Sequence, residues 1–337
     1  MASNAAFSRR ELTELLHQNG ALPQGSVTNV RVDLQVDTLF SHLTFVKLKY
    51  SANASPGLPK QLLIKRSLSG VTQSELEFYA RFAAELSSPP LLPWYLTTSN
   101  GALLLQDLRT THWTASWPDL PSDQICLQTV TTLAQVHAQW WENPDLGVTI
   151  GAPHSTESLS TMVAGIAASL PGFCDAATAL LSKEKLRLLE RVFSSSLKPW
   201  LRLTNPQALT VVHGDAHIWN FLLPRVEGGP VYLIDWQLWH VDVGVRDLAF
   251  LMAAHWDGEQ RDRLEIRLLH RYHEELLARQ VSNYSRDDLW LDYRLCAIRN
   301  LTIPILLWKR GVNDEMWQAR LSSVLTAYDD LDCEELL

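Results

Sequence analysis

Alternating apolar and polar positions characterise the first hundred residues of the chain. Residues 27–36, 43–50 and 61–65 are rich in β-branched or alternating apolar residues, and a Ser/Asn/Pro/Gly turn at residues 51–59 precedes the third of these runs. Residues 102–105 form a further, continuously apolar run. This pattern predicts buried strands, the first three of which build an antiparallel sheet.

One short helix is predicted before the first strand. The sequence Ser-Arg-Arg-Glu at residues 8–11 is a capping box, and Leu12, Leu15 and Leu16 then share one helical face. Gly20 is the expected stop signal.

Helical spacing occurs once between the third and fourth strands and dominates the rest of the chain. The predicted helices are 72–86, 122–141, 155–170, 176–195, 244–256, 262–279, 285–309 and 313–328. Pro304 predicts a kink in the seventh of these. The order of elements indicates an α+β fold with a small, antiparallel β-rich N-terminal lobe (residues 1–107) and a larger, mostly helical C-terminal lobe (residues 108–337).

Two neighbouring segments carry polar residues of the kinds that phosphoryl transfer requires. The apolar residues 211–212 lead into His213-Gly214-Asp215, and Asn220 follows five residues after the aspartate. A short hairpin then leads into the apolar residues 231–234, which end at Asp235. Transfer of a phosphoryl group requires an aligned acceptor hydroxyl and neutralisation of the phosphate charge.

Each of these residue types suits one part of that chemistry. We expect Asp215 to orient the acceptor hydroxyl and accept its proton, and Asn220 and Asp235 to provide oxygen ligands for Mg²⁺. His-Gly-Asp alone is a common turn sequence, and an aspartate after a strand is often a helix cap. The order strand, His-Gly-Asp, Asn, strand, Asp favours the catalytic interpretation.

The chain resembles the aminoglycoside phosphotransferase and choline kinase superfamily, and most closely its ecdysteroid-kinase-like (CHK kinase-like) branch. The segments that carry the resemblance are 213–220, 234–237 with 247–251 after it, 133–141 and 103–108. The resemblance implies a two-lobed, protein-kinase-like fold and a small-molecule kinase that uses ATP or GTP with Mg²⁺. The acceptor would be a hydroxyl group of a metabolite, steroid-like compound or antibiotic, and the resemblance does not identify it.

In such a lobe, a lysine on the third strand holds the α- and β-phosphates, and a helix glutamate holds the lysine. Lys65 matches this position, whereas Lys47 and Lys49 lie one strand too early, where exposed lysines are usual. Glu75 and Glu77 are both candidates for the partner. The resemblance favours Glu75, although it also completes a capping-box sequence beginning at Thr72.

The sequence signals for the remaining nucleotide contacts are less specific. The turn at residues 37–43 contains no glycine, although glycines usually allow the backbone to approach a phosphate. Ser41 is a candidate hydroxyl donor there, with an ordinary hairpin serine as the alternative. By position, Gln106 and Leu108 are expected to offer backbone groups to the base.

Five further side chains in or near these segments have predicted roles. His217 is a candidate for contact with the transferred phosphate, with loop stabilisation or solvent exposure as the alternatives. His213 is expected to support the loop, and His137 to pack within its helix. Asp247, with Arg246, is expected to cap or pin the following helix. Tryptophans near the catalytic segments suit either a substrate wall or core packing.

Composition narrows the possible partners. The net charge is −8 and no block of Lys or Arg occurs, which argues against nucleic acid and weakly favours a cationic acceptor. Four scattered cysteines form no CxxC pair, so neither a zinc cluster nor a disulfide scaffold is expected. The chain shows no signal-peptide core and no apolar run long enough for a membrane span, so we expect a cytoplasmic protein with no membrane partner.

Two other classes of function stay open. A nucleotide-binding pseudokinase or interaction protein would keep the fold without transfer, but the presence of every expected catalytic side chain disfavours it. A hydrolase that uses Asp215 and His217 on water has no Gly-x-Ser-x-Gly elbow or metal-ligand cluster to support it.

Overall fold

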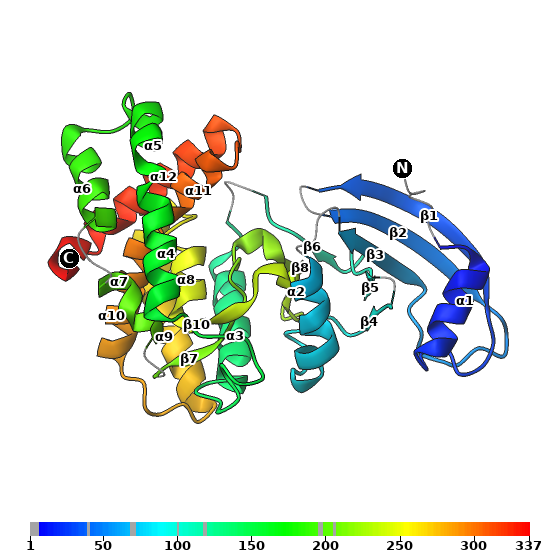
Figure 1. Cartoon of the computed structure of the whole chain (residues 1–337). Coiled ribbons are helices and arrows are strands. Elements are labelled where there is room, and N and C mark those ends of the chain that lie inside the picture. Colours follow the sequence, from blue (N-terminus) through cyan, green and yellow to red (C-terminus); the bar gives the residue numbers. More distant parts are fainter. Residues whose placement is uncertain are drawn as a thin grey trace. The chain divides into compact units, whose positions relative to one another are not determined.

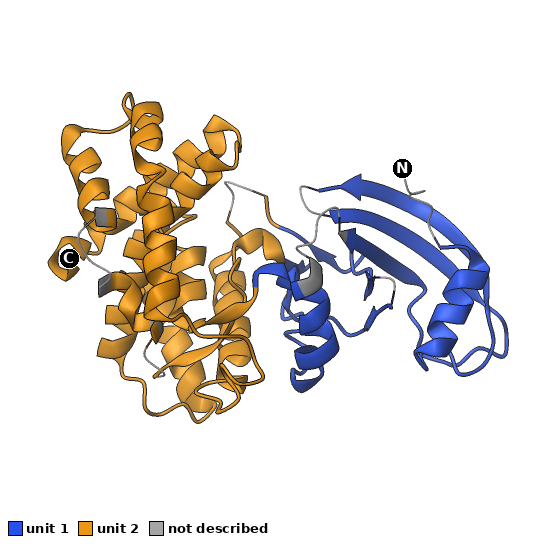
Figure 2. Ribbon diagram, viewed as in Figure 1, with its two compact units in different colours: residues 1–114, 221–238 blue, residues 115–220, 239–337 orange. Residues whose placement is uncertain are grey.

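The computed structural model describes residues 7–38, 41–67, 72–99, 101–116, 120–194, 198–204 and 207–337. Contacts divide the chain into two compact units, shown in different colours in Figure 2. The sheet unit comprises residues 1–114 and 221–238, and the helical unit comprises residues 115–220 and 239–337. Residues 221–238 belong to the sheet unit because they return to pair with a strand near residue 112.

The sheet unit is built on one five-stranded antiparallel sheet. In spatial order its strands are β1 (Val27–Asp37), β2 (Ser41–Tyr50), β3 (Gln61–Ser67), β5 (Ala102–Gln106) and β4 (Tyr95–Thr97). A smaller sheet joins β6 (His112–Trp113), β8 (Phe221–Pro224) and β9 (Tyr232–Leu233). The predicted strands over 27–36, 43–50, 61–65 and 102–105 are confirmed. Strands of two or three residues, such as β4 and β6, are too short to show alternation.

Helix α1 (Arg9–Gln18) covers one face of this sheet (Figure 1). The capping box is present, since Glu11 N donates to Ser8 Oγ at 3.2 Å and Ser8 N donates to Glu11 Oε2 at 2.7 Å. Leu12 and Leu16 are fully buried in a cluster that includes Ile64 of β3. Because side chains alternate along a strand, the neighbouring Lys65 lies on the opposite face. The predicted helix over 72–86 is α2 (Thr72–Glu77), continued by a π-helical segment and a 3₁₀ turn.

The helical unit contains the longer helices of the chain. Its helices are α3 (Asp123–Gln139), α4 (Thr156–Ala167), α5 (Leu170–Ala177), α6 (Lys183–Ser194), α7 (Lys198–Leu201), α8 (Val245–Leu251), α9 (Gly258–Ala278), α10 (Arg286–Arg299), α11 (Thr302–Lys309) and α12 (Asp314–Asp330). Two short strands, β7 (Leu209–Val212) and β10 (His240–Val243), pair antiparallel. Within the described residues no single helix is long and apolar enough to cross a membrane. Helices α4 and α5, which are bent relative to each other, reach that length and apolar composition only when taken together.

Two predicted helices are wrong because each is two helices. Residues 176–195 contain the end of α5 and the whole of α6, and the chain restarts at Ser182, whose hydroxyl accepts from Lys185 N at 3.2 Å. The predicted helix over 285–309 breaks at Asn300 and Leu301 between α10 and α11. Pro304 therefore lies in the first turn of α11, where its missing N–H is tolerated, and it does not kink a longer helix.

Two predicted boundaries near the catalytic segments also differ. Helix α8 ends at Leu251 instead of 256, and Arg320 Nη1 donates to the carbonyl oxygens of Ala254 and His255 in the irregular turn that follows. Helix α9 begins four residues early, at Gly258, because the Asp257 side chain accepts from Gln260 N at 2.8 Å.

We expect Ser182→Ala to lower the free energy of unfolding of the helical unit by about 1 kcal/mol, because it removes the acceptor that begins α6. Denaturant titration followed by circular dichroism measures the change. Ser160→Ala is the matched control, since this mid-helix serine of α4 bonds only the preceding turn and alanine has the higher helix propensity. Equal destabilisation by both substitutions would contradict the capping role.

Candidate functional site

The loop after β7 is held by one buried carboxylate. Asp247 Oδ2 accepts from His213 N at 2.7 Å, and Asp247 Oδ1 accepts from Gly214 N at 2.9 Å. His137 Nε2 lies 3.1 Å from the same carboxylate, and His137 and Asp247 are both fully buried. Gly214 has a φ of +80°, a conformation that favours glycine. Asp247 therefore fixes the turn that presents Asp215, rather than capping its own helix as the sequence suggests.

The pKa of Asp247 reflects this network. Burial raises the pKa of the carboxyl group, but the hydrogen bond from His137, the charges of His137 and His213 and the Gly214 N–H together outweigh it. The pKa is lowered overall, so the carboxylate form is the one that the fold stabilises.

Asp215 and two of the predicted site residues lie together in this loop. Asn220 Nδ2 donates to the carbonyl oxygen of Asp215 at 2.8 Å and to its Oδ2 at 3.1 Å. His217 Nε2 lies 3.5 Å from the same Oδ2. Asp215 N in turn donates to His213 Nδ1 at 3.3 Å, so the predicted supporting role of His213 is confirmed. The side chains of Asp215 and His217 each keep about a fifth of their surface exposed.

The amide of Asn220 has an orientation that suits a metal ligand. Because its nitrogen donates to Asp215, its oxygen is not engaged there and is the hard ligand atom that Mg²⁺ prefers. Among the described residues, no group of three or more His, Cys, Asp or Glu side chains has the arrangement of a metal site.

In the sheet unit, Lys65 lies between two carboxylates. Its Nζ is 2.8 Å from Glu75 Oε2 and 2.5 Å from Asp235 Oδ1. Glu75 is completely buried, whereas the Asp235 side chain is 30% exposed. Glu77, the competing candidate, instead pairs with Arg81 at 2.5 Å. Asp235 adopts a φ of +68°, a strained backbone conformation for a residue with a side chain and one often found at functional sites.

Charge pairing and burial act in opposite directions on this lysine. Burial lowers the pKa of Lys65, but the charges of Glu75 and Asp235 outweigh it and raise the pKa overall, so the ammonium form is stabilised. Burial raises the pKa of Glu75, and the nearby Lys65 opposes that rise. The geometry therefore keeps a positive charge fixed on this face of the sheet.

The strand register shows which other side chains share the face of Lys65. Lys65 is opposite Leu43, which is opposite Val36, and Ser41 lies two positions before Leu43 on the same side. Leu34 is similarly opposite Phe45. The exposed fractions of Leu34 and Val36 are 43% and 39%, so an apolar strip borders Lys65. Leu34 and Val36 continue the apolar alternation of Val30 and Val32, but the bulge between Val32 and Leu34 moves them to the face of Lys65, which alternation alone does not predict.

Lys47 lies on the same face but is already paired. Its Nζ is 2.9 Å from Asp33 Oδ1, and it lies four residues after Leu43, the β2 partner of Lys65. The Arg109 guanidinium joins the same network through Asp33 and Asp107, and lies 3.8 Å from the centroid of the Phe45 ring. Arg109 thus covers one end of the apolar strip by cation–π stacking.

The segment after β5 uses some of its backbone groups internally. Gln106 N donates to Trp94 O at 3.0 Å, and Leu108 O accepts from Thr111 N and His112 N. Among the residues that the structure describes, none accepts a hydrogen bond from Leu108 N. Leu108 N–H is therefore the group of this segment best able to meet the edge of a base.

The tryptophans near the site differ in burial: two lie in the core and one is partly exposed. Trp236 is fully buried and stacks on Phe78 with ring centroids 3.9 Å apart, so it belongs to the core of the sheet unit. Trp140 is also fully buried. Trp219 remains partly exposed beside His217, with ring centroids 4.6 Å apart.

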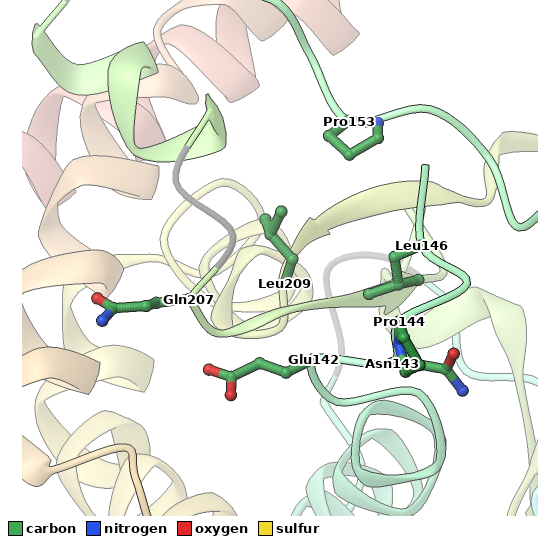
Figure 3. Close-up of a pocket in the computed structure, with 7 residues that line it drawn as sticks. All are labelled: Glu142, Asn143, Pro144, Leu146, Pro153, Gln207 and Leu209. Atoms are coloured by element: carbon green, nitrogen blue, oxygen red, sulfur yellow. The ribbon is translucent and has the colours of Figure 1, made fainter. Parts of the chain in front are cut away.

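A separate pocket of about 370 Å³ opens in the helical unit (Figure 3). Its lining includes Glu142, Pro153 and Leu209. Leu209 begins β7, so the pocket lies at the opposite end of this strand from the catalytic loop. The carboxylate of Glu142 is engaged by Ala208 N and Asn283 Nδ2, which gives this pocket a structural rather than a catalytic character.

The sequence profile of the phosphotransferase enzyme family matches residues 61–286. No curated protein matches the sequence. Among solved structures, a choline kinase from Cryptosporidium parvum Iowa II is 13% identical, with 91% of each chain covered and a TM-score of 0.61. An ethanolamine kinase from Plasmodium vivax is 14% identical over 91% of this chain and 83% of that chain, with a TM-score of 0.59. A spectinomycin phosphotransferase in complex with ADP and spectinomycin is 14% identical over 99% of this chain and 100% of that chain, with a TM-score of 0.53. At these identities the three structures show that the chain has the α+β fold of these kinases.

We expect Asp247→Asn to reduce the free energy of unfolding of the helical unit by at least about 2 kcal/mol. The two carboxylate oxygens of Asp247 accept from His213 N and Gly214 N and contact His137, whereas an asparagine side chain has only one oxygen that can accept a hydrogen bond. Hydrogen exchange at His213 and Gly214 should accelerate. The stabilisation is present above the unfolded pKa of about 3.9 and is lost as pH falls through the lowered folded pKa.

The difference in unfolding free energy between wild type and Asp247→Asn should therefore shrink in acid. Asp262→Asn, at an exposed position of α9, is the control and should show no such pH dependence. A difference that grows as the pH falls would contradict the assignment.

Proposed function

The chain belongs to the phosphotransferase enzyme family, and from that premise we propose that it transfers the γ-phosphoryl group of ATP or GTP to a hydroxyl group of a small molecule. The observation that carries the proposal is the pair of Lys65 and the fully buried Glu75, 2.8 Å apart, on the face of an antiparallel sheet. A buried ion pair of this kind fixes an ammonium where phosphates can be bound.

The nucleotide would bind on the face of the sheet that carries Lys65. Leu34 and Val36 offer apolar surface to the flat base, and Leu108 N–H offers a donor to its edge. Ser41, on the same face as Lys65, is proposed as a hydroxyl donor to a phosphate in this glycine-free turn. Gln106 positions the segment through its bond to Trp94 and is not itself proposed as a donor to the base.

The loop held by Asp247 supplies the groups proposed for the acceptor. Asp215 orients the incoming hydroxyl and accepts its proton as the bond to phosphorus forms. Asn220 holds Asp215 in place, because its amide nitrogen donates both to the backbone carbonyl oxygen and to the carboxylate of Asp215. His217, 3.5 Å from the same carboxylate, is proposed to contact the transferred phosphoryl group.

Asn220 and Asp235 are the residues proposed to hold Mg²⁺, and the donor set fits that ion. One amide oxygen and one carboxylate are hard oxygen ligands, and two protein ligands are the number expected when the phosphates supply others. When bound, Mg²⁺ would neutralise the charge on the phosphates.

Three finer assignments belong to the same proposal. Residues 1–107 would serve mainly the nucleotide, and residues 108–337 the catalytic loop, the metal and the acceptor. The CHK kinase-like branch is proposed from the order of the two catalytic segments, and a cytoplasmic location from the scattered cysteines. Both ATP and GTP are compatible with a base bound through backbone groups.

We expect a screen of hydroxylated compounds to give acceptor-dependent ADP or GDP release, with mass spectrometry detecting one added phosphate on the acceptor. Asp215→Asn should then lower kcat at least about a hundredfold with nucleotide affinity nearly intact, because only acceptor activation is lost. Turnover close to wild type in this variant would refute the proposed role of Asp215.

We further expect Lys65→Ala to weaken nucleotide binding or slow transfer severely, and Glu75→Gln to add little once Lys65 is gone, since the two act as one unit. Isothermal titration with a non-hydrolysable nucleotide measures the binding. Lys47→Ala is the matched control, because this lysine lies on the same face and is also paired with a carboxylate. Equal losses from Lys47→Ala and Lys65→Ala, or additivity between Lys65 and Glu75, would place the phosphates elsewhere.

A further inference from the structure

Aromatic rings gather beside Asp215 in the helical unit. The His217 ring lies 4.6 Å from Trp219 and 5.5 Å from His255, and Phe250 lies 4.7 Å from His255. These four side chains, here called the aromatic cluster, are each partly exposed. A partly exposed group of rings within reach of a catalytic carboxylate is a surface on which a flat or apolar molecule can rest.

Two arginines flank the aromatic cluster. The Arg246 guanidinium lies 5.6 Å from the Phe250 centroid, and the Arg320 guanidinium lies 5.7 Å from the Trp219 centroid. Both guanidinium groups therefore place positive charge next to the rings, Arg246 from a partly exposed side chain and Arg320 from a buried one. Arg320 is anchored from α12 by its bonds to backbone carbonyls of the turn after α8.

Arg246 differs from other arginines of the helical unit in how its charge is balanced. Its hydrogen bond goes to the neutral amide of Asn300, and among the described residues no carboxylate lies within ion-pair distance of it. Arg299 and Arg202, by contrast, pair directly with Asp242 and Asp292.

The pKa of Arg246 reflects the same imbalance. Burial and then the charge of Arg299 lower the pKa of Arg246, and the opposing charges of Cys296, Asp242 and Asp247 only partly offset them. A guanidinium whose environment disfavours its charge gains from an anionic ligand.

Burial and neighbouring charges also affect the pKa values of two other groups beside the rings. Burial lowers the pKa of His255 well below its ordinary value, and the charges of Arg320, His217 and Arg246 lower it further. His255 Nδ1 lies 2.7 Å from Phe250 O, which can only accept, so the neutral ring keeps its proton on Nδ1. Burial also lowers the pKa of Arg320 to about 10. The indole N–H of Trp219 adds a buried donor with no acceptor among the described residues.

We propose that the aromatic cluster with Arg246 and Arg320 is the acceptor subsite, and that it selects a hydroxylated ring compound carrying an anionic group such as a carboxylate. The rings provide apolar contact, Arg246 pairs with the anion, and Asp215 meets the hydroxyl. An amine in place of the anion would lie beside the Arg246 guanidinium, which has no carboxylate within ion-pair distance among the described residues, while Asp215 is taken by the hydroxyl. The inference rests on the proposed function for the role of Asp215, and it runs against the weak expectation of a cationic acceptor from net charge.

The test is binding of small hydroxylated ring compounds in matched sets that differ only in one group. Each set has a carboxylate, its methyl ester and the corresponding primary amine, for example 4-hydroxyphenylacetate, its methyl ester and tyramine. Affinities are measured by NMR titration of the full-length protein. We expect the carboxylates to bind at least about fivefold more tightly than the amines, with the esters between them, as for a partly exposed ion pair.

Arg246→Gln should abolish this preference, and Arg246→Lys should retain part of it. Arg263→Gln, which removes the same charge from an exposed position of α9, should leave it unchanged. The inference would be overturned if the amines bound more tightly than the carboxylates. It would also be overturned if no set showed a preference by charge, or if none of the compounds bound. Because the comparison within each set uses wild-type protein, it decides the matter even if Arg246→Gln does not fold.

Failure of this inference is distinguishable from failure of the proposed function. Nucleotide binding and its dependence on Lys65 are measured separately. Loss of the charge preference with Lys65-dependent nucleotide binding intact refutes only the acceptor class. A preserved charge preference without any nucleotide binding refutes the phosphotransferase assignment instead.

Discussion

The geometry of the loop after β7, which presents Asp215, depends on the buried carboxylate of Asp247. It accepts two consecutive backbone N–H groups, from His213 and Gly214, and is itself oriented by His137 of α3. Unpaired backbone donors in a buried turn would each cost about 1–3 kcal/mol, so the turn is stable only with this acceptor in place. The position of Asp215 and, through it, of Asn220 follows from that single group.

The elements could be predicted from the sequence where a local pattern fixes them. The capping box at Ser8, the alternation in β2 and β3 and the long amphipathic helices are signals of a few neighbouring residues. The two merged helices were wrong because apolar spacing continues across residues 178–182 and 300–301, and only hydroxyl capping at Ser182 and the turn at Asn300 separate the helices. Periodicity alone carries no information about such breaks.

The same distinction applies to the site. His213, Asp215 and Asn220 are recognisable because their spacing lies within one short segment. The role of Asp247 was misassigned because it acts on residues more than thirty positions away, and the sequence showed only its own helix. The apolar strip at Leu34 and Val36 depends on a bulge in the β1–β2 register, and the flanking of Trp219 by Arg320 depends on the docking of α12. Both features arise from tertiary contacts between distant segments, so the sequence of any one segment does not predict them.

Net charge describes the whole chain and not the surroundings of one site. The chain carries a net charge of −8, yet the guanidinium groups of Arg246 and Arg320 lie 5.6 and 5.7 Å from the rings of Phe250 and Trp219, and the nearest carboxylate is that of Asp215, 3.5 Å from His217. Charges beyond about 8–10 Å are screened in physiological salt, so a ligand responds to its nearest groups rather than to the sum.

The two carboxylate partners of Lys65 differ in their exposure to solvent. Glu75 is fully buried and Asp235 is 30% exposed. A divalent cation that binds Asp235 must compete with the ammonium 2.5 Å away, whereas Glu75 has no access to solvent and keeps its hold on the lysine. Lys65 thus has one fully buried and one partly exposed partner, so Glu75 would hold the lysine in place if Asp235 bound a metal ion.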